Sequence, residues 1–417
     1  MSTPTKSPAA IGVLGAALGL VFATLSTLDY ARHLDRRLHD VHCSLIPGVS
    51  AGASEDNPCR AAMYSVYSAV FRGSLWGGIP IALFAVGAFA FFLGFATYLL
   101  LTGDRAPRWT LWFFAATGST PLLVSLVMFL VSLFELGSLC KVCIGIYISS
   151  LLLALGAWLH AVKSSQPQPA AAPPQPVHPA EARATKDFSP WSVLAPAGCL
   201  ALLAAATAIP SIVYAAAAPD ERPYIRGCGK LEKPVESHGA LVALKTSRPI
   251  RAATLFEDPL CPTCKAFHQR IVAEGAFEKL DAKLALFPLD SECNWMLSTP
   301  LHPGACLLSR AVICGGESAR QVLEWAYDEQ EHLAALGKSG PLALRAAIVQ
   351  KWGQRLGECI DATPTKLRQN QQLHFAADNA IAVSTPQLFL GSARVCDEDT
   401  DLGLRYTLNE LAPELLQ

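Results

Sequence analysis

Five long apolar stretches constrain most strongly what this chain can fold into. A helix needs about 20 mostly apolar residues to cross the hydrocarbon core of a bilayer. None of the five stretches carries Lys, Arg or Asp at its centre, and only 16% of all residues are charged, against roughly 25% in soluble domains. We therefore expect five membrane-spanning helices, at residues 10–28, 76–101, 109–134, 142–161 and 191–217.

The first stretch has a second interpretation. It is short and follows Lys6, which is also the pattern of a signal-peptide core. The residues after it contain no convincing small-residue cleavage site. We therefore interpret it as a retained helix.

The segments between these stretches define the expected domains. The connection at 29–75 is longer than ordinary loops, which suggests that it has a function. Residues 163–190 are rich in Pro, Ala and Gln, a composition typical of an unfolded, semi-rigid linker. The chain is thus expected to contain a four-helix membrane bundle at 1–162, this linker, a fifth membrane helix at 191–218 and a soluble domain at 219–417.

The soluble part alternates between strand and helix patterns. Strands are expected at 251–256, 283–287 and 387–390, and helices at 264–280, over most of 305–380 and at 400–412. This order is typical of an α/β domain with a central sheet and, here, a helical insertion.

The cysteines indicate the chemistry. The chain has 13, including two Cys-x-x-Cys pairs, Cys140–Cys143 and Cys261–Cys264. This usage points to thiol–disulfide chemistry in an oxidising compartment. The net charge of −1 and the lack of a basic patch argue against a nucleic-acid partner.

Counting membrane crossings relates the cysteines to one another. Cys43 and Cys59 lie between the first two helices, and the Cys140–Cys143 pair lies between the third and fourth. Two crossings separate these sites, and two more lead to the Cys261–Cys264 pair, so all three pairs are expected on one face. The Lys and Arg distribution is mixed under the positive-inside rule. An outward, oxidising face agrees with the cysteines.

The Cys261–Cys264 pair follows a strand and opens a helix. A helix N-terminus stabilises a thiolate at Cys261, and Cys264 can then resolve a mixed disulfide. The alternatives are a zinc half-site or a buried structural disulfide. Zinc would need a second ligand pair, and the domain has no other Cys-x-x-Cys or spaced His pair, so we expect no metal. His268, on the same helix, is expected to be a solvated or packing residue.

The soluble part resembles the thioredoxin fold, and more closely its DsbA-like branch. The segment Phe256–Phe267 is similar to that branch's strand end, active site and first helix, and the resemblance covers roughly 240–417. Thr385 and Pro386 match the cis-proline loop. The resemblance implies that this loop faces the active-site disulfide and contacts the backbone of the substrate.

The membrane part resembles the vitamin K epoxide reductase family over about 10–160. The segment Cys140–Tyr147 has that family's Cys-x-x-Cys-x-x-x-Tyr pattern, and Cys59 is followed six residues later by Ser65. Gly78–Pro80 is similar to the motif that opens the family's second helix, and Cys43 would be the first loop cysteine. Fusion to a thioredoxin-like domain is an arrangement of bacterial members.

Together the resemblances imply an electron relay. The Cys261–Cys264 pair would take electrons from thiols of exported proteins and pass them to Cys43 and Cys59, which would reduce the Cys140–Cys143 pair. The acceptor would be a quinone of the membrane pool (ubiquinone or menaquinone), with Tyr147 and Ser65 near its oxygens. The enzyme would reside in the cytoplasmic membrane with its redox parts on the periplasmic side.

Alternatives remain open at this stage. The same parts could run as a disulfide reductase or isomerase, or as a quinone epoxide reductase. A non-enzyme interpretation is a membrane receptor with a disulfide-stapled outer domain. The Cys140–Cys143 pair could consist of packing cysteines, and Tyr147 could be an interfacial belt residue.

Seven cysteines have no place in this relay. Cys199 lies within the fifth apolar stretch and is most simply a small apolar residue. The other six allow 15 connectivities. We expect the structural bridges Cys293–Cys306, Cys314–Cys359 and Cys228–Cys396.

Overall fold

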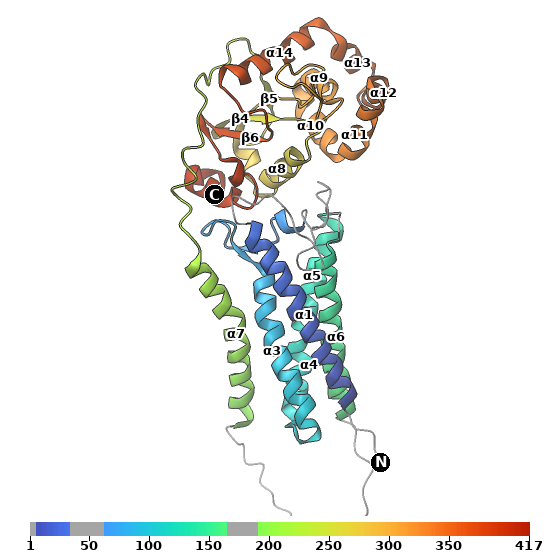
Figure 1. Ribbon diagram of the computed structural model, residues 1–417, viewed down its shortest axis with the longest axis vertical. Coiled ribbons are helices and arrows are strands. Elements are labelled where there is room, and N and C mark those ends of the chain that lie inside the picture. The colour runs from blue at the N-terminus through green and yellow to red at the C-terminus, as the bar shows by residue number, and fades with distance from the viewer. Residues whose placement is uncertain (1–5, 34–61, 138, 165–190) are drawn as a thin grey trace, which may run out of the picture. The chain divides into compact units, whose positions relative to one another are not determined.

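The computed structural model describes residues 6–33, 62–137, 139–164 and 191–417 (Figure 1). The chain divides into two compact units. The first comprises the chain up to Val70 together with Ile79–Ala218, and the second comprises Phe71–Gly78 together with Pro219–Gln417.

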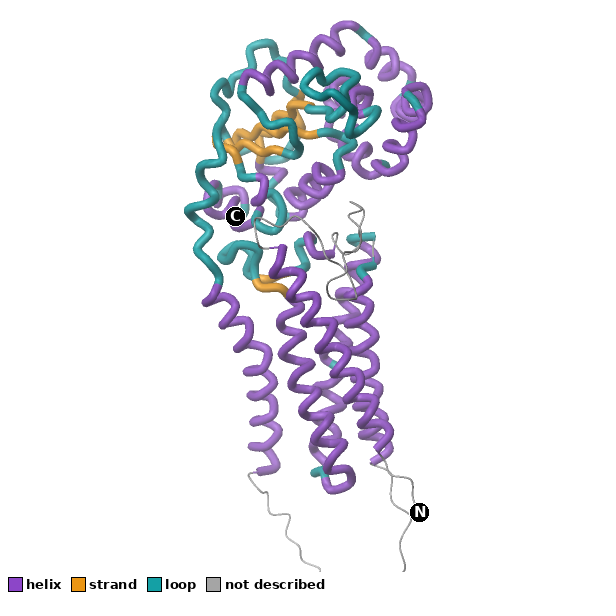
Figure 2. Tube along the Cα trace, in the orientation of Figure 1, coloured by secondary structure: helices purple, strands orange, loops and turns teal. Residues whose placement is uncertain are grey.

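The described part of the first unit is almost entirely helical (Figure 2). Five helical segments of the described chain are long and apolar enough to cross a membrane, with α4 and α5 counting together as one. This confirms the expected number of apolar helices. The elements are α1 (Lys6–His33), β1 (Ala69–Val70), β2 (Ile79–Pro80), α3 (Ile81–Thr102), η1 (Gly103–Arg105), α4 (Arg108–Gly118), α5 (Thr120–Phe134), α6 (Lys141–Ser164) and α7 (Trp191–Ala217).

Two predicted helix boundaries were wrong. The second apolar stretch becomes helical only at Ile81 rather than at 76, because Gly77 and Gly78 have positive φ values of 72° and 76°. The third is interrupted at Ser119, which separates α4 from α5. Pro121 lies in the first turn of α5, where its missing N–H is tolerated.

Helix α1 packs against α6 and α3, and α7 packs on the outer side of α3. Small residues let α1 and α6 approach closely: a Cβ atom on Gly15 would lie 2.5 Å from the backbone N of Leu153. Close approach through small residues is a main source of helix association in a bilayer. Phe89, Phe92 and Phe114 fill the core of this unit.

The second unit contains a five-stranded mixed sheet in the order β3-β5-β4-β6-β7. Its central pair, β4 and β5, is parallel, whereas the pairs β3–β5, β4–β6 and β6–β7 are antiparallel. This is the expected mixed sheet with helices, in a thioredoxin-like arrangement. The strands are β3 (Val242–Leu244), β4 (Arg251–Glu257), β5 (Leu280–Leu286), β6 (Gln387–Leu390) and β7 (Ala393–Arg394).

Alternation along the strands gives the sheet two buried faces. Successive side chains of a strand point to opposite faces. Leu255 shares one cluster with Phe267 of α8, and its neighbour Phe256 shares the other with Phe375 of α14. Helices α8 and α14 therefore cover opposite faces of the sheet.

Most expected features of this unit are present with shifted bounds. Helix α8 ends at Ala273 instead of 280, since Gly275 adopts a φ of 72°, and β5 begins three residues earlier than expected. The helices are α8 (Pro262–Ala273), η3 (Phe277–Lys279), α9 (Ala305–Gly315), η4 (Gly316–Ser318), α10 (Ala319–Asp328), α11 (Gln330–Ser339), α12 (Pro341–Trp352), α13 (Gln354–Asp361), α14 (Thr363–Asp378), η5 (Asp397–Asp399), α15 (Leu404–Leu411) and η6 (Pro413–Leu415).

The segment Phe71–Gly78 belongs to the second unit although it lies between two membrane helices in sequence. Arg72 forms a buried ion pair with Glu274, whose carboxylate also contacts Arg405 at 2.6 Å. The indole N–H of Trp76 donates to Asp399 at 2.7 Å. The paired charges make this segment an integral part of the unit, because an uncompensated buried charge would be strongly destabilising.

Candidate redox site

The Cys261–Cys264 pair lies where β4 turns into α8. Cys261 has an extended backbone and caps α8, and Pro262 occupies the first helical position, which suits its fixed φ. Cys261 is 4% exposed and Cys264 is completely buried, and both are free thiols. Both thiols are therefore buried, and only Cys261 keeps a small exposed edge.

Hydroxyl and carbonyl groups surround the sulfur of Cys261. Its Sγ lies 2.8 Å from Thr263 Oγ1 and 3.6 Å from the carbonyl oxygen of Thr385. Thr263 also donates to that carbonyl, at 3.1 Å. The Thr385–Pro386 peptide bond is cis. The structure thus brings the loop at Thr385 and Pro386 beside Cys261.

The two thiols differ in acidity. The pKa of Cys261 is lowered to about 7, first by the hydrogen bond from Cys264 and further by the hydroxyl of Thr263. Burial, together with the proximity of Cys261, raises the pKa of Cys264 well above its ordinary value. Since the thiolate is the nucleophile, the lower pKa makes Cys261 the more nucleophilic of the two thiols.

A buried polar cluster lies on the inner side of the pair, and the sequence reasoning missed it. Glu257, the last residue of β4, is fully buried, and burial raises its pKa. The hydroxyl of Tyr327 donates to its Oε2 at 3.0 Å. His268 is 3% exposed and its ring packs against Phe277, so this side chain is buried and not solvated. The sequence did contain one signal for this cluster: Glu257 is an acidic residue at the end of an apolar strand, shortly before the Cys-x-x-Cys pair.

Gln330 of α11 holds the active-site turn from a second side. Its Nε2 donates to the carbonyl oxygens of Pro259 and Cys261, each at 3.1 Å. It is 6% exposed, so both hydrogen bonds are shielded from water. The helical insertion therefore positions the redox turn as well as covering the sheet.

The first unit contains a cavity of about 310 Å³ among its apolar helices. Most of its wall is apolar, with Phe84, Phe89 and Met128 among the lining side chains. The expected residues Ser65, Cys140, Cys143 and Tyr147 all line it. The structure therefore brings these four together around one mainly apolar cavity.

Several hydroxyl groups also line the cavity. Tyr147 Oη lies 3.4 Å from Ser132 Oγ, and its ring packs edge-on against Phe129. Ser125 Oγ donates to Ser150 Oγ at 2.9 Å. Ser125, Ser132 and Ser150 were not singled out in the sequence because a lone serine in an apolar helix carries no distinctive pattern. Such a wall suits a flat apolar molecule with a few polar oxygens.

Cys43 and Cys59, expected to form the loop pair, lie outside the described residues. Ser65, a few residues further on, donates its hydroxyl to the carbonyl oxygen of Ala62 at 2.8 Å. Within the first unit, the chain that follows this loop and the N-terminal end of α6 line the same cavity.

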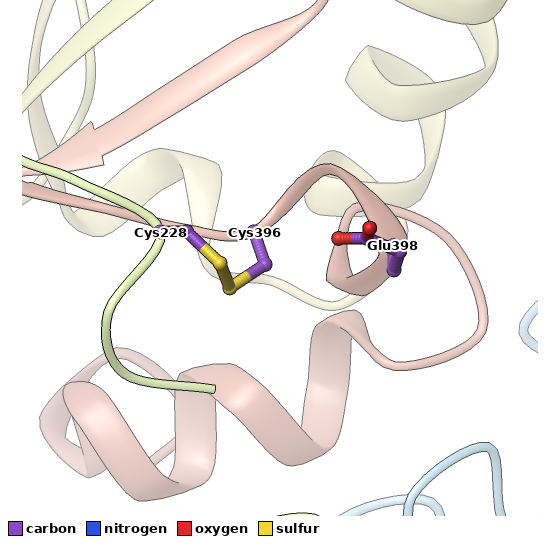
Figure 3. Close-up of side chains that lie close together, drawn as sticks. All are labelled: Cys228, Cys396 and Glu398. Atoms are coloured by element: carbon purple, nitrogen blue, oxygen red, sulfur yellow. A yellow bond between two sulfur atoms is a disulfide. The ribbon is translucent and has the colours of Figure 1, made fainter. Parts of the chain in front are cut away.

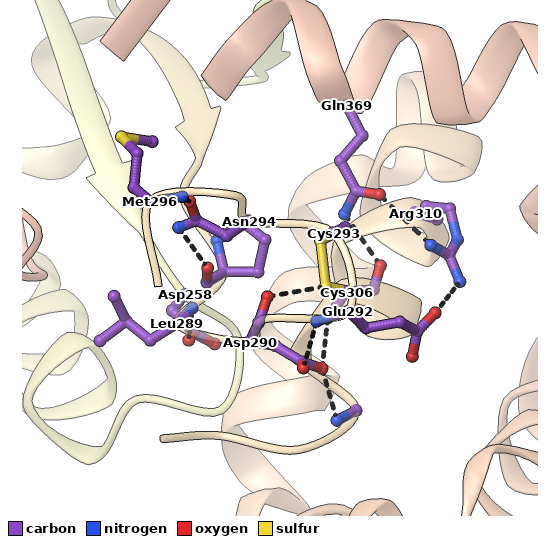
Figure 4. Close-up of a disulfide and its surroundings, with 12 residues drawn as sticks. Asp258, Leu289, Asp290, Glu292, Cys293, Asn294, Met296, Cys306, Arg310 and Gln369 are labelled. Carbon is purple, nitrogen blue, oxygen red and sulfur yellow. Dashed lines mark hydrogen bonds and ion pairs between the residues drawn. A yellow bond between two sulfur atoms is a disulfide. The ribbon is translucent and has the colours of Figure 1, made fainter. Parts of the chain in front are cut away.

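Three disulfides staple the second unit. They join Cys228 to Cys396, Cys293 to Cys306 and Cys314 to Cys359. Figure 4 shows Asp290 beside the Cys293–Cys306 bridge, where its carboxylate accepts from Gly304 N at 2.8 Å. The Cys314–Cys359 bridge ties α9 to α13.

One group of potential metal ligands occurs in the described part of the chain: Cys228, Cys396 and Glu398, within 4.8 Å of one another (Figure 3). Both of its sulfurs are engaged in the disulfide. They therefore offer no thiolate, which is the form that binds zinc.

Comparison with known proteins bears on the first unit. Residues 10–158 match the model of the Vitamin K epoxide reductase family, a family of oxidoreductases. The match is about a third of the chain and contains the cavity-lining cysteines. No curated protein and no solved structure matches the chain. The matched region and the two Cys-x-x-Cys pairs support a membrane-embedded redox enzyme.

Proposed function

We propose that this chain is a membrane thiol oxidase that forms disulfides in exported proteins and passes the electrons to a quinone. The observation that carries the proposal is the cavity in the first unit. Both Cys143 and Tyr147 line this one mainly apolar cavity among the apolar helices.

The residues of this cavity fit a quinone. A quinone supplies an apolar acceptor of two electrons and two protons, the number that one dithiol releases on becoming a disulfide. The apolar side chains would hold the ring and its tail, and Tyr147 and Ser65 would orient the oxygens. Cys143 would face the ring, and Cys140 would close the disulfide as electrons leave.

The substrate would enter at the second unit. Cys261, with its pKa near 7, provides a stabilised thiolate. Stabilising the reduced form makes a disulfide more oxidising. This favours oxidation of substrate thiols over the reductase or isomerase alternative. Thr385 and Pro386, beside Cys261, would bind the backbone of the substrate.

The loop pair Cys43 and Cys59 would connect the two Cys-x-x-Cys sites. The segment Phe71–Gly78, which follows Cys59 in the same connection, belongs to the unit that carries Cys261. The crossing count supports the same assignment, because it puts all three cysteine pairs on one membrane face. That face would be the periplasmic side of the cytoplasmic membrane, where disulfides persist.

The test is quinone reduction by the reduced, full-length protein in detergent or lipid. The wild type should convert a soluble ubiquinone or menaquinone analogue to the quinol, and Cys143→Ala should abolish this. Cys199→Ala, which removes a cysteine of α7 that does not line the cavity, is the matched control and should react like the wild type. Quinol formation that survives Cys143→Ala would refute the proposal.

A further inference from the structure

The buried cluster behind Cys264 continues to the protein surface. His268 lies on α8 between two carboxylates: its Nδ1 is 4.0 Å from Glu257 Oε2, and its Nε2 is 3.7 Å from Glu324 Oε1. The side chain of Glu257 is fully buried, whereas that of Glu324 is 38% exposed. The imidazole thus stands between an internal acid and one in contact with water.

Both ring nitrogens of His268 are buried, and neither has a hydrogen-bond partner among the described residues. Buried polar atoms without partners are rare and costly. Each nitrogen is nevertheless less than 1 Å beyond hydrogen-bond range of a carboxylate. Side-chain displacements on the order of 1 Å are ordinary thermal motion, so the ring can reach either acid in turn.

Cys264 needs such a connection. Its Sγ lies 3.4 Å from the backbone N of Asp258, next to Glu257, and no part of Cys264 is exposed to water. When the disulfide is reduced, a new bond forms between the attacking sulfur and Cys261, and the bond between Cys261 and Cys264 breaks. The electron pair goes to Cys264, which must gain a proton, and it must lose that proton again on reoxidation.

We infer that His268 carries this proton between Glu257 and the surface residue Glu324. Glu257 gives a proton to the Cys264 sulfur, His268 replaces it, and Glu324 exchanges protons with water. The reverse sequence operates on reoxidation. The inference rests on the proposed thiol–disulfide function. It adds a proton path that begins at Cys264 and ends at the surface residue Glu324.

The charged groups around His268 agree with this path. Burial raises the pKa of Glu257, which favours the protonated form of this acid. The interaction with His268, with help from Arg320, lowers the pKa of Glu324, so that carboxylate stays ionised and accepts. Tyr327 faces Glu257 from α10. The ring of Phe277 packs edge-on against the imidazole of His268, and the guanidinium of Arg320 lies over the Phe277 ring.

The test is single-turnover reduction of the Cys261–Cys264 disulfide by dithiothreitol in the full-length protein. Alkylation quenching and mass spectrometry of the peptide that carries the pair follow the reaction at several pH values. This reductant makes the measurement independent of quinone and of the direction of flow in the cell. The proposed function can therefore be refuted while the proton path is supported, and the proton path can be refuted while the proposed function is supported.

Glu324→Gln is the decisive variant, because Glu324 is half-exposed and its replacement should not disturb folding. Arg320 pairs with both Glu324 and Glu278, so Glu278→Gln removes an equivalent ion pair without touching His268 and is the matched control. We expect Glu324→Gln and His268→Gln to slow reduction by about tenfold, less than the hundredfold typical of a direct general acid. Added imidazole should restore the rate of Glu324→Gln.

Two results would overturn the inference. One is a rate and pH profile of Glu324→Gln equal to those of Glu278→Gln. The other is a slow Glu324→Gln that imidazole does not accelerate, since a purely structural defect would not respond to a small proton carrier. The equilibrium of the pair with glutathione should be the same in Glu324→Gln and the wild type, because a proton path alters rates alone.

Discussion

Two thiols within one helical turn behave differently because their surroundings differ. The sulfur of Cys261 lies beside the thiol of Cys264 and the hydroxyl of Thr263, whereas Cys264 is enclosed by apolar side chains and a buried acid. The first environment favours a thiolate and the second a thiol. The lower pKa of Cys261 suits an attacking sulfur, and the raised pKa of Cys264 suits a resolving sulfur.

Alkylation of the reduced protein tests this difference. We expect the reaction of iodoacetamide with Cys261 to be half-maximal near pH 7, against about 8.5 for an unperturbed thiol. Cys264 should stay unlabelled across that range. Thr263→Val keeps the side-chain shape and removes the hydroxyl, so it should shift the midpoint upward. A midpoint of about 8.5 in the wild type would contradict the account.

The buried acid makes a prediction about stability. The pKa of Glu257 is raised on folding by burial, so its favourable contribution is complete below the unfolded pKa and is lost as pH rises through the folded pKa. We therefore expect Glu257→Gln to unfold at a higher temperature than the wild type at about pH 7.5, and at an equal temperature at about pH 4. Thermal unfolding of the detergent-solubilised chain measures both; a variant less stable at both pH values would count against burial of the charge.

For single residues, the sequence predicts which side chains are candidates for reaction better than it predicts which side chains lie close together. The Cys-x-x-Cys spacing made Cys261 and Cys143 candidates for reactive thiols, because such thiols need a fixed partner one turn away. It could not identify Glu257, His268 and Glu324, which come from a strand and two helices. Such a cluster exists only once the sheet and helices are packed.

Among the elements, the membrane helices were visible in the sequence because length and apolarity alone define them. Their ends were less visible. The break at Ser119 and the late start at Ile81 depend on local backbone geometry, which an apolar run conceals. Similarly, β3 is only three residues long and was missed, since so short a strand has no readable alternation.

The close contact between α1 and α6 gives a prediction at the scale of elements. A Cβ on Gly15 would meet backbone atoms of α6, whereas one on Gly94 of α3 would meet nothing within 4 Å. We expect Gly15→Ala to lower the free energy of unfolding by about 1–3 kcal/mol through overpacking. Gly94→Ala should be neutral or stabilising by up to about 1 kcal/mol through helix propensity.

Denaturation of the purified protein in mixed micelles, followed by tryptophan fluorescence, compares the two variants. Both carry the same substitution in an apolar helix, so the difference between them reports the helix contact itself. Equal stabilities would mean that α1 and α6 do not approach through Gly15.

The whole molecule contains two candidate redox sites, one in each of its two units. The first unit has a mainly apolar cavity with Cys143 and Tyr147 in its wall, and the second has a thioredoxin-like sheet with Cys261 in the turn after its central strand β4. The match of residues 10–158 to an oxidoreductase family supports the first half. Neither half alone would turn substrate thiols into reduced quinone.

The most direct test of the central claim counts both products in one reaction. The full-length protein receives a reduced dithiol peptide and a quinone analogue, and peptide disulfide and quinol are measured together. The relay predicts equal amounts from the wild type and neither product, beyond background, from Cys261→Ser. Undiminished quinol formation by Cys261→Ser with the peptide as the sole reductant would show that electrons do not pass through the second unit, and would contradict the account.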